Sequence, residues 1–193
     1  MGETDKEIIQ KVLDGNVQTF ALLVERHKAK AMTLALRILK NREDAEEALQ
    51  DSFVRAYHGL SSFEWKSSFS TWFYRIVYNT CASAAGKRSR MYPVSIQEEE
   101  DGSSTEIVSD ELPPDIKLES DEFSSIVHEE VEKLPVVYGS TFTLFVIQEM
   151  SYEEIVRVTG LPLGTVKARL FRARAMLREA IVKRIGHPMA IIE

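Results

Sequence analysis

Aromatic side chains are concentrated in one short stretch of the sequence, between residues 63 and 78. Seven of these sixteen residues are aromatic, although aromatic residues make up only 9% of the chain. One helix face cannot bury so many rings, so we expect some to be exposed, and exposed rings beside cations suit stacking on unpaired nucleic-acid bases. The rings are Phe63, Trp65, Phe69, Trp72, Phe73, Tyr74 and Tyr78, and the nearby cations are Lys66, Arg75, Lys87, Arg88 and Arg90.

The hydrophobic core of a helical domain is the alternative location for these rings. The loop that begins at Gly59 is rich in hydroxyl groups as well as rings, and it leads into a helix predicted over residues 70–80. We expect burial for most rings of that helix, above all for Trp72. Exposure is expected mainly for Tyr74, Tyr78 and the loop residues.

A second stretch suited to nucleic-acid chemistry lies between residues 166 and 185, which contain seven basic residues and one acidic residue. At 100° per residue, a helix here places its apolar residues on one narrow stripe and its basic residues elsewhere. A helix exposed only for solubility would mix the two signs of charge. Lysine and arginine donate hydrogen bonds to guanine or to phosphate, and the small Ala168 permits close approach to base edges. The apolar stripe is Val166, Leu170, Ala173 and Leu177.

The residues before this helix predict a helix-turn-helix. Ser151-Tyr-Glu-Glu154 is a capping box, which opens a short helix. Gly160 ends that helix and Pro162 prevents its continuation, so the basic helix begins near Gly164. A helix after Leu134-Pro135 provides the packing partner that a helix-turn-helix needs.

Three amphipathic helices are predicted in the first part of the chain. The first begins at Asp5 as its N-cap, the second extends from Phe20 to about Lys40, and the third begins near Glu43. The third helix has an apolar face and a polar face, and solvation alone accounts for such a polar face. Its apolar face is Ala45, Leu49, Phe53, Ala56 and Leu60.

Charge is distributed unevenly along the chain. The net charge of −6 divides into +3 for residues 1–92, −12 for 93–133 and +3 for 134–193, so two mildly basic blocks flank an acidic segment rich in Pro, Gly and Ser. The total net charge is therefore a poor guide to whether the protein binds nucleic acid. One cysteine indicates a reducing, cytoplasmic setting, and no apolar run is long enough to cross a membrane.

These segments, in this order, resemble the extracytoplasmic-function (ECF) class of bacterial sigma factors, in the sigma-70 family. The matching segments are residues 44–57, 69–79, 134–135, 151–155 and 164–174. The resemblance implies an all-α fold of two small domains: a sigma-two helical bundle at 1–92 and a sigma-four helix-turn-helix domain at 123–193. An acidic flexible linker at 93–122 joins them.

The resemblance also implies RNA polymerase core as a partner. The first domain would bind the clamp helices of the largest subunit, and the second would bind the flap region. The resemblance therefore favours polymerase binding over plain solvation as the role of the polar face of the third helix. The implied clamp-binding residues are Glu47, Gln50, Asp51 and Phe53.

Promoter DNA is the other implied partner, recognised at two elements. At the −10 element Asn79 and the 61–71 loop would hold a base flipped out of the duplex, which costs a few kcal/mol. The implied −10 residues are Phe63, Trp65, Lys66, Ser70, Thr71, Tyr74, Arg75, Asn79, Lys87 and Arg88. The implied −35 residues are Thr165, Lys167, Ala168, Arg169, Phe171, Arg172 and Arg174.

Family members are usually held inactive by an anti-sigma factor, so the resemblance implies such a partner too. The acidic linker is interpreted either as a plain tether or as a segment that lies along the polymerase's RNA path and mimics nucleic acid. The chain departs from the family at three places: residues 81–86 lack the basic residues that usually follow the asparagine at position 79, Gly139 stands where an arginine is frequent, and Ala168 stands where a serine is common.

A stand-alone helix-turn-helix regulator, which binds duplex DNA without polymerase, is the leading alternative. It accounts for residues 151–185 but leaves 43–80 unexplained. We expect no cofactor, no metal and no enzymatic activity, because no ligand cluster, phosphate loop or nucleophile–base pair is present in the sequence. We expect His27 to be a satisfied core histidine and Cys81 to be buried.

Overall fold

The structure, a computed structural model, describes residues 3–91 and 121–185, except for the side chains of 88–91, 121–125 and 185. Within these residues the chain is all-helical and contains no strand, as predicted. The expected linker lies almost wholly outside the described residues. The helices are α1 (Asp5–Leu13), α2 (Phe20–Leu39), α3 (Arg42–Gly59), α4 (Phe69–Met91), α5 (Asp121–Lys133), α6 (Val136–Val146), α7 (Tyr152–Thr159) and α8 (Leu163–Ile185).

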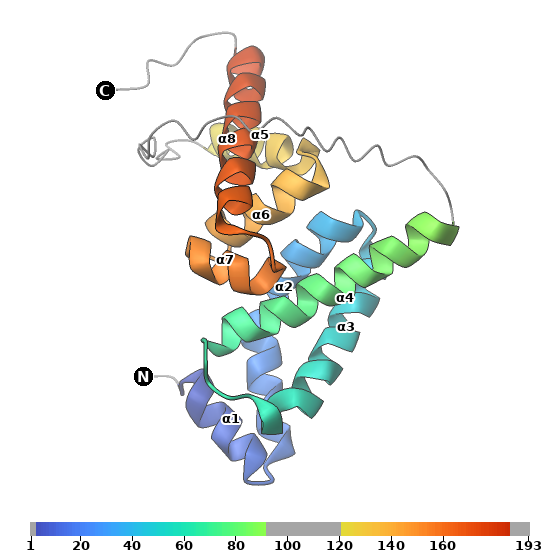
Figure 1. The fold of residues 1–193 in the computed structure, drawn as a ribbon, viewed down its shortest axis with the longest axis vertical. Coiled ribbons are helices and arrows are strands. Elements are labelled where there is room, and N and C mark those ends of the chain that lie inside the picture. Colours follow the sequence, from blue (N-terminus) through green and yellow to red (C-terminus); the bar gives the residue numbers. More distant parts are fainter. Residues whose placement is uncertain (1–2, 92–120, 186–193) are drawn as a thin grey trace.

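Helices α1 to α4 form the first domain, in which α2, α3 and α4 pack against one another (Figure 1). Aromatic rings fill the space between these helices. Phe53 of α3 stacks on Phe73 of α4 with ring centres 4.6 Å apart, and Phe69 stacks on Phe73 at 5.8 Å. Such pairs add to the stabilisation that comes from burying their surface. The apolar face predicted for the third helix is the face that packs in this core.

The N-cap of α1 differs from the prediction by one residue. Thr4, not Asp5, caps the helix, because Thr4 and Glu7 form a reciprocal capping box. Asp5 is thereby free to reach α2, where it accepts a hydrogen bond from His27 Nε2 at 2.9 Å and pairs with Arg26. His27 is therefore a satisfied core histidine, as expected.

Helices α5 to α8 form the second domain, and α7 and α8 make the predicted helix-turn-helix. Ser151 caps α7 with Glu154 in a capping box, and Gly160 ends α7 at a φ of +74°. All four residues of the predicted apolar stripe of α8 are buried against the other helices. The short interhelical turn that follows Gly160 sets the angle at which α8 leaves α7 (Figure 1).

The two domains pack directly against each other. Helix α7 lies against α4, and α6 lies against α2 (Figure 1). Leu144, Met150, Ile155 and Val158 of the second domain belong to the same hydrophobic cluster as the first domain's core. No described helix is both long and apolar enough to cross a membrane. The described residues also contain no group of His, Cys, Asp or Glu that could hold a metal ion.

Candidate nucleic-acid interface

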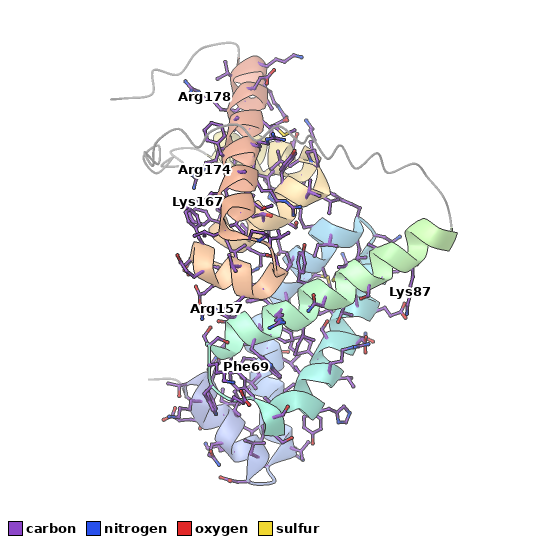
Figure 2. The ribbon with its side chains drawn as sticks, in the orientation of Figure 1. Phe69, Lys87, Arg157, Lys167, Arg174 and Arg178 are labelled. Atoms are coloured by element: carbon purple, nitrogen blue, oxygen red, sulfur yellow. The ribbon has the colours of Figure 1, made fainter. Side chains whose placement is uncertain are left out.

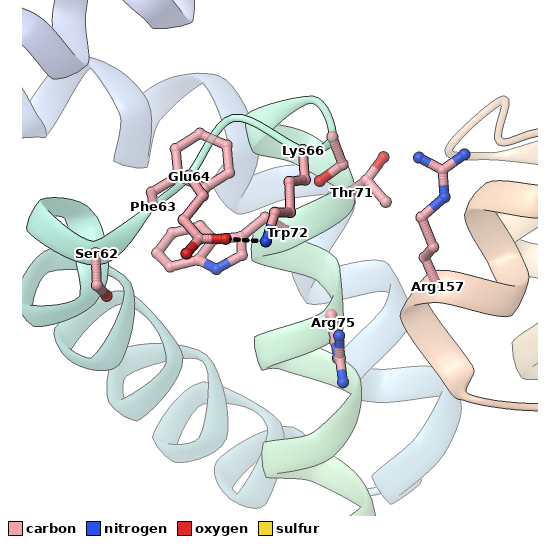
Figure 3. Close-up of a pocket in the computed structure, with 9 residues that line it drawn as sticks. Ser62, Phe63, Glu64, Lys66, Thr71, Trp72, Arg75 and Arg157 are labelled. Carbon is pink, nitrogen blue, oxygen red and sulfur yellow. Dashed lines mark ion pairs between the residues drawn. The ribbon is translucent and has the colours of Figure 1, made fainter.

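A cavity of about 270 Å³ lies between the loop before α4 and the first turns of that helix. Rings, hydroxyl groups and cations line it together, which is the combination that a nucleobase requires. Figure 3 shows Trp72 beneath the loop, with the Glu64–Lys66 ion pair in front of it and Arg75 farther along α4. The lining residues are Ser62, Phe63, Glu64, Lys66, Ser67, Thr71, Trp72, Arg75 and Arg157.

Hydroxyl groups hold the loop onto the start of α4. Ser68 Oγ accepts a hydrogen bond from the backbone N–H of Thr71 at 3.1 Å, which caps the helix. The same Oγ lies 2.9 Å from Ser70 Oγ and 2.8 Å from Thr71 Oγ1. The hydroxyl-rich sequence of the loop thus fixes one wall of the cavity.

Trp65 is the exposed ring at the tip of the loop. Its backbone is left-handed, with a φ of +59°, and 43% of its surface is exposed. Its ring packs on Phe63 with centres 4.7 Å apart, and Lys6 lies 6.0 Å from the ring centre. A bulky residue in this backbone region is uncommon and is found mostly where the surrounding structure holds it in place.

The structure separates the sequence-predicted −10 residues into exposed and buried groups. Trp65, Lys66, Arg75, Asn79 and Lys87 are exposed and Ser70 is half-buried, whereas Phe63, Thr71 and Tyr74 are buried. Arg88 lies in α4, but its side chain is outside the described residues. Trp72, expected in the core, is only half-buried and lies on the cavity wall.

Three of these expectations are corrected by the geometry. Phe63, a loop residue that was expected to be exposed, is only 8% exposed and packs on Trp72 with ring centres 4.9 Å apart. Tyr74 was expected to be exposed, but it is only 2% exposed and packs edge-on to His27, so it cannot stack on a base. Burial raises the pKa of its hydroxyl, and the nearby Asp5 carboxylate raises it further. Asn79 does not line the cavity, because it lies eight residues beyond Thr71, about 12 Å along the helix.

The polar face of α3 is the candidate surface for polymerase. Glu47 and Gln50 are exposed there, and Asp51 is half-buried and accepts a hydrogen bond from Arg55 at 2.8 Å. Phe53 was predicted for both faces of this helix. Its ring is buried against Phe73, so we remove it from the set of surface residues.

Helix α8 presents an outer stripe of basic residues around one exposed ring. Figure 2 shows Lys167, Arg174 and Arg178 along α8, and their spacing of seven and four residues places them on one face with Phe171. Phe171 is 71% exposed, the largest value among the exposed apolar residues. The sequence-predicted −35 residues did not include Arg178. Its position four residues after Arg174, on the same face of a helix, could have indicated it.

The other predicted −35 residues lie around this stripe. Ala168 is exposed, and Thr165, Arg169 and Arg172 are half-buried. Arg172 Nη1 donates a hydrogen bond to the Tyr138 hydroxyl at 3.3 Å. These residues share the part of α8 nearest the turn, but at 100° per residue Thr165, Arg169 and Arg172 lie on a different side of the helix from Lys167 and Arg174.

Two aromatic contacts orient the cations of the stripe. Lys167 Nζ lies 5.9 Å from the ring centre of Tyr152, and the Arg174 guanidinium lies 5.1 Å from that of Phe145. Such cation–π contacts restrict long side chains while leaving their donors available.

Arg157 is a cavity residue that the sequence prediction missed. It belongs to α7 of the second domain, yet it lines the cavity together with residues of the first domain and lies on the Thr71 side of it (Figure 3). No pattern in the sequence places Arg157 there, because its position depends on how the domains pack. Cys81, by contrast, is buried as expected, and burial raises the pKa of its thiol to about 12.

Comparisons with known proteins match both domains. The family model described as sigma-70 region 2 matches residues 23–91, and that described as sigma-70, region 4 matches residues 124–177. The RNA polymerase sigma-H factor of Pseudomonas aeruginosa is 32% identical over 182 residues, which cover 93% of this chain and 94% of that protein. The ECF RNA polymerase sigma-E factor of Escherichia coli is 34% identical over 174 residues, 89% of this chain and 91% of that protein.

Two solved structures share the fold. One is the sigma factor RpoE of Bartonella quintana in complex with the anti-sigma factor NepR, with a TM-score of 0.59 and 24% identity over 84% of this chain and 96% of that one. The other is CnrH in complex with the cytosolic domain of CnrY, with a TM-score of 0.61 and 23% identity over 94% of this chain and 99% of that one.

Proposed function

The chain belongs to the sigma-70 family, in its ECF class of RNA polymerase sigma factors, and from that membership we propose how its residues act. It binds RNA polymerase and directs transcription initiation at promoters. The observation that supports the assignment to residues is that each matched region presents rings beside cations, at the cavity next to α4 and along α8.

The second domain reads the −35 element with α8. Phe171 and the basic stripe enter the major groove, where lysine and arginine donate to guanine edges or to phosphates. Arg174 and Arg178 lie farther along the helix and contact the backbone. Ala168 allows the helix to come close to the bases.

The first domain opens the −10 element by binding energy alone. The cavity beside Trp72 takes one base that has left the stack, and Trp65 stacks on another. Stacking on a ring is worth roughly 1–3 kcal/mol per base, which matches the few kcal/mol that flipping costs. Arg75 and Lys66 neutralise the phosphates around this base. We propose no catalytic role for the protein, since bond formation belongs to the polymerase.

Polymerase core is bound by the polar face of α3, through Glu47, Gln50 and Asp51, on the clamp helices of the largest subunit. The second domain binds the flap region. We also propose an anti-sigma partner, since one of the two solved structures with this fold, RpoE, is bound to the anti-sigma factor NepR. The protein acts in the cytoplasm, where polymerase is.

We propose domain limits of 1–92 and 123–193; the family models match residues 23–91 and 124–177 within them. A stand-alone regulator is not favoured, because it gives no role to the matched region of the first domain.

Promoter binding with and without polymerase tests this function. Purified protein, core and a labelled promoter duplex are mixed in pairs and together, and complexes are resolved on a gel. We expect a promoter-specific complex only when protein and core are both present. Tight duplex binding by the protein alone, unchanged by core, would instead establish the stand-alone regulator.

A further inference from the structure

Gly59 is the last residue of α3, and the indole of Trp72 lies directly against it. A Cβ at residue 59 would lie 3.0 Å from Trp72 Cζ2 and 3.2 Å from Cη2, two carbons of the six-membered ring. Carbon atoms in contact are most stable about 3.5–4.0 Å apart, so any side chain at this position would press on the indole. The absence of a side chain therefore sets how closely Trp72 approaches the end of α3.

The backbone of Gly59 does not itself call for glycine. Its φ of −84° and ψ of −9° lie in the right-handed helical region, which alanine also adopts. Glycine in a helix costs stability relative to alanine, because it loses more conformational freedom on folding. The space that the indole occupies is the feature that alanine would disturb.

Three rings pack in a row from Gly59 to the tip of the loop. Phe63 packs on Trp72 with ring centres 4.9 Å apart, and Trp65 packs on Phe63 at 4.7 Å. The Ser62 hydroxyl donates a hydrogen bond to the Gly59 carbonyl at 2.9 Å, which ties the start of the loop to the same residue. Because closely packed rings transmit strain to one another, a shift of Trp72 displaces the two rings beyond it.

Trp72 lies at the −10 surface rather than in the hydrophobic core. It is half-buried and lines the base cavity together with Phe63 (Figure 3). Phe69 and Phe73, its neighbours in α4, fill the core and are at most 2% exposed. Trp65, the last ring of the row, is 43% exposed. Both places proposed to hold an unpaired base are thus built on one indole.

We propose that Gly59 is a positioning residue for promoter opening, because it lets the Trp72 indole lie where the cavity and the loop rings can stack on unpaired bases. The proposal rests on the −10 role proposed above. Gly59 acts through Trp72 and makes no contact with DNA itself. Its effect is confined to opening, since Asp51, the nearest residue of the polymerase-binding face, lies eight residues earlier in α3, about 12 Å along the helix.

Four variants separate an effect through Trp72 from an effect on the fold. Gly59→Ala introduces the close contact, and Gly86→Ala is the matched control, because Gly86 is also helical and a Cβ there meets nothing within 4 Å. Trp72→Phe removes Cζ2 and Cη2, the two atoms that the new Cβ would meet. The double variant Gly59→Ala/Trp72→Phe therefore carries the alanine without that contact. Urea unfolding shows whether each variant is folded, and a fluorescence titration gives its affinity for core.

Opening is measured with a promoter duplex that carries 2-aminopurine in the −10 element, whose fluorescence rises when the base leaves the stack. We expect holoenzyme with Gly59→Ala to have an equilibrium constant for opening about tenfold below that of wild type, which is part of the value of one stacked base. Gly86→Ala behaves as wild type, and all variants bind core equally. Trp72→Phe alone also reduces opening, but Gly59→Ala causes no further loss when it is added to Trp72→Phe, since both act through the same indole.

A folded Gly59→Ala variant that opens the promoter as wild type does would overturn this role of Gly59. A loss of opening that is equally large in the presence of Trp72→Phe would also overturn it, because the effect would then not pass through the indole. If Gly59→Ala fails to fold alone, the double variant decides. A folded double variant that opens the promoter as Trp72→Phe does supports the proposal, and one that is unfolded or opens it less overturns it. Absence of opening by wild-type holoenzyme would instead overturn the proposed function, so the two failures are distinguishable.

Discussion

At the scale of single residues, neighbouring positions on α8 have opposite roles. Leu170 is 1% exposed in the core and Phe171 points to solvent. We expect Phe171→Ala to reduce transcription from a −35-dependent promoter while changing the free energy of unfolding by less than about 0.5 kcal/mol. Leu170→Ala should destabilise the protein by about 2–5 kcal/mol. Run-off transcription and urea unfolding measure the two effects, and a large loss of stability in Phe171→Ala would contradict this assignment.

Acid sensitivity is a second property of individual residues. Burial opposes ionisation of Asp5, but hydrogen bonds from His27 and Arg26 outweigh it and hold its pKa below the usual value. A carboxylate with a lowered pKa stabilises the fold above its unfolded pKa, and this stabilisation is lost as the pH falls through the folded one. We therefore expect Asp5→Asn to be less stable than wild type at pH 7. The gap between the urea midpoints of the two proteins should begin to narrow below about pH 4 and close as the pH falls through the lowered pKa of Asp5. A gap that stays constant as the pH is lowered from 7 to 2 would contradict this role of Asp5.

The sequence predicted correctly whether a residue is buried or exposed where the helical spacing of apolar residues was the only relevant signal. The buried stripe of α8 and the cap at Ser151 follow from spacing alone and are confirmed. Periodicity placed Phe53 on the buried face of the third helix, which is confirmed, whereas the resemblance also placed it on the polymerase-binding surface, from which its burial removes it. Tyr74 was expected to be exposed, and the packing of His27 of α2 against its ring, which a linear pattern does not contain, buries it.

At the scale of elements, α3 carries the proposed polymerase contact. Glu47 lies on its exposed face, with no ion pair to lose. Reversal of its charge by Glu47→Lys should weaken core binding about tenfold. A charge of the wrong sign at an interface loses attraction to the partner surface and adds repulsion, which costs binding free energy. Glu25→Lys, at an exposed position of α2 where the glutamate pairs with Lys28, is the control. If a fluorescence titration gave Glu47→Lys the same affinity for core as wild type, α3 would not be part of the interface.

Helix positions were predictable to within a few residues because caps and breakers are local signals. Gly160 and the Ser151 capping box place α7 and α8 correctly. The N-cap of α1 was assigned one residue late because both Thr4 and Asp5 are residue types that cap helices, and only the Glu7 partner distinguishes them.

At the scale of the whole molecule, the domain contact was not predictable from the sequence. Arg37 donates a hydrogen bond to the Leu134 carbonyl across this contact, although the two residues are 97 apart in the sequence, and Gly139 was noticed only as a departure from the family. The structure gives that glycine a physical reason, since its missing side chain makes room for Arg37. The net charge of −6 was equally uninformative until divided along the chain, because the acidic segment at 93–133 outweighs the mildly basic blocks at 1–92 and 134–193.

Transcription with purified core on genomic DNA fragments tests the central claim most directly. Start sites are mapped with core alone and with core plus protein, and the upstream sequences are aligned. The account predicts new start sites that depend on the protein and share two conserved elements, near −35 and −10. Start sites identical to those of core alone, or protein-dependent sites without two shared elements, would contradict it.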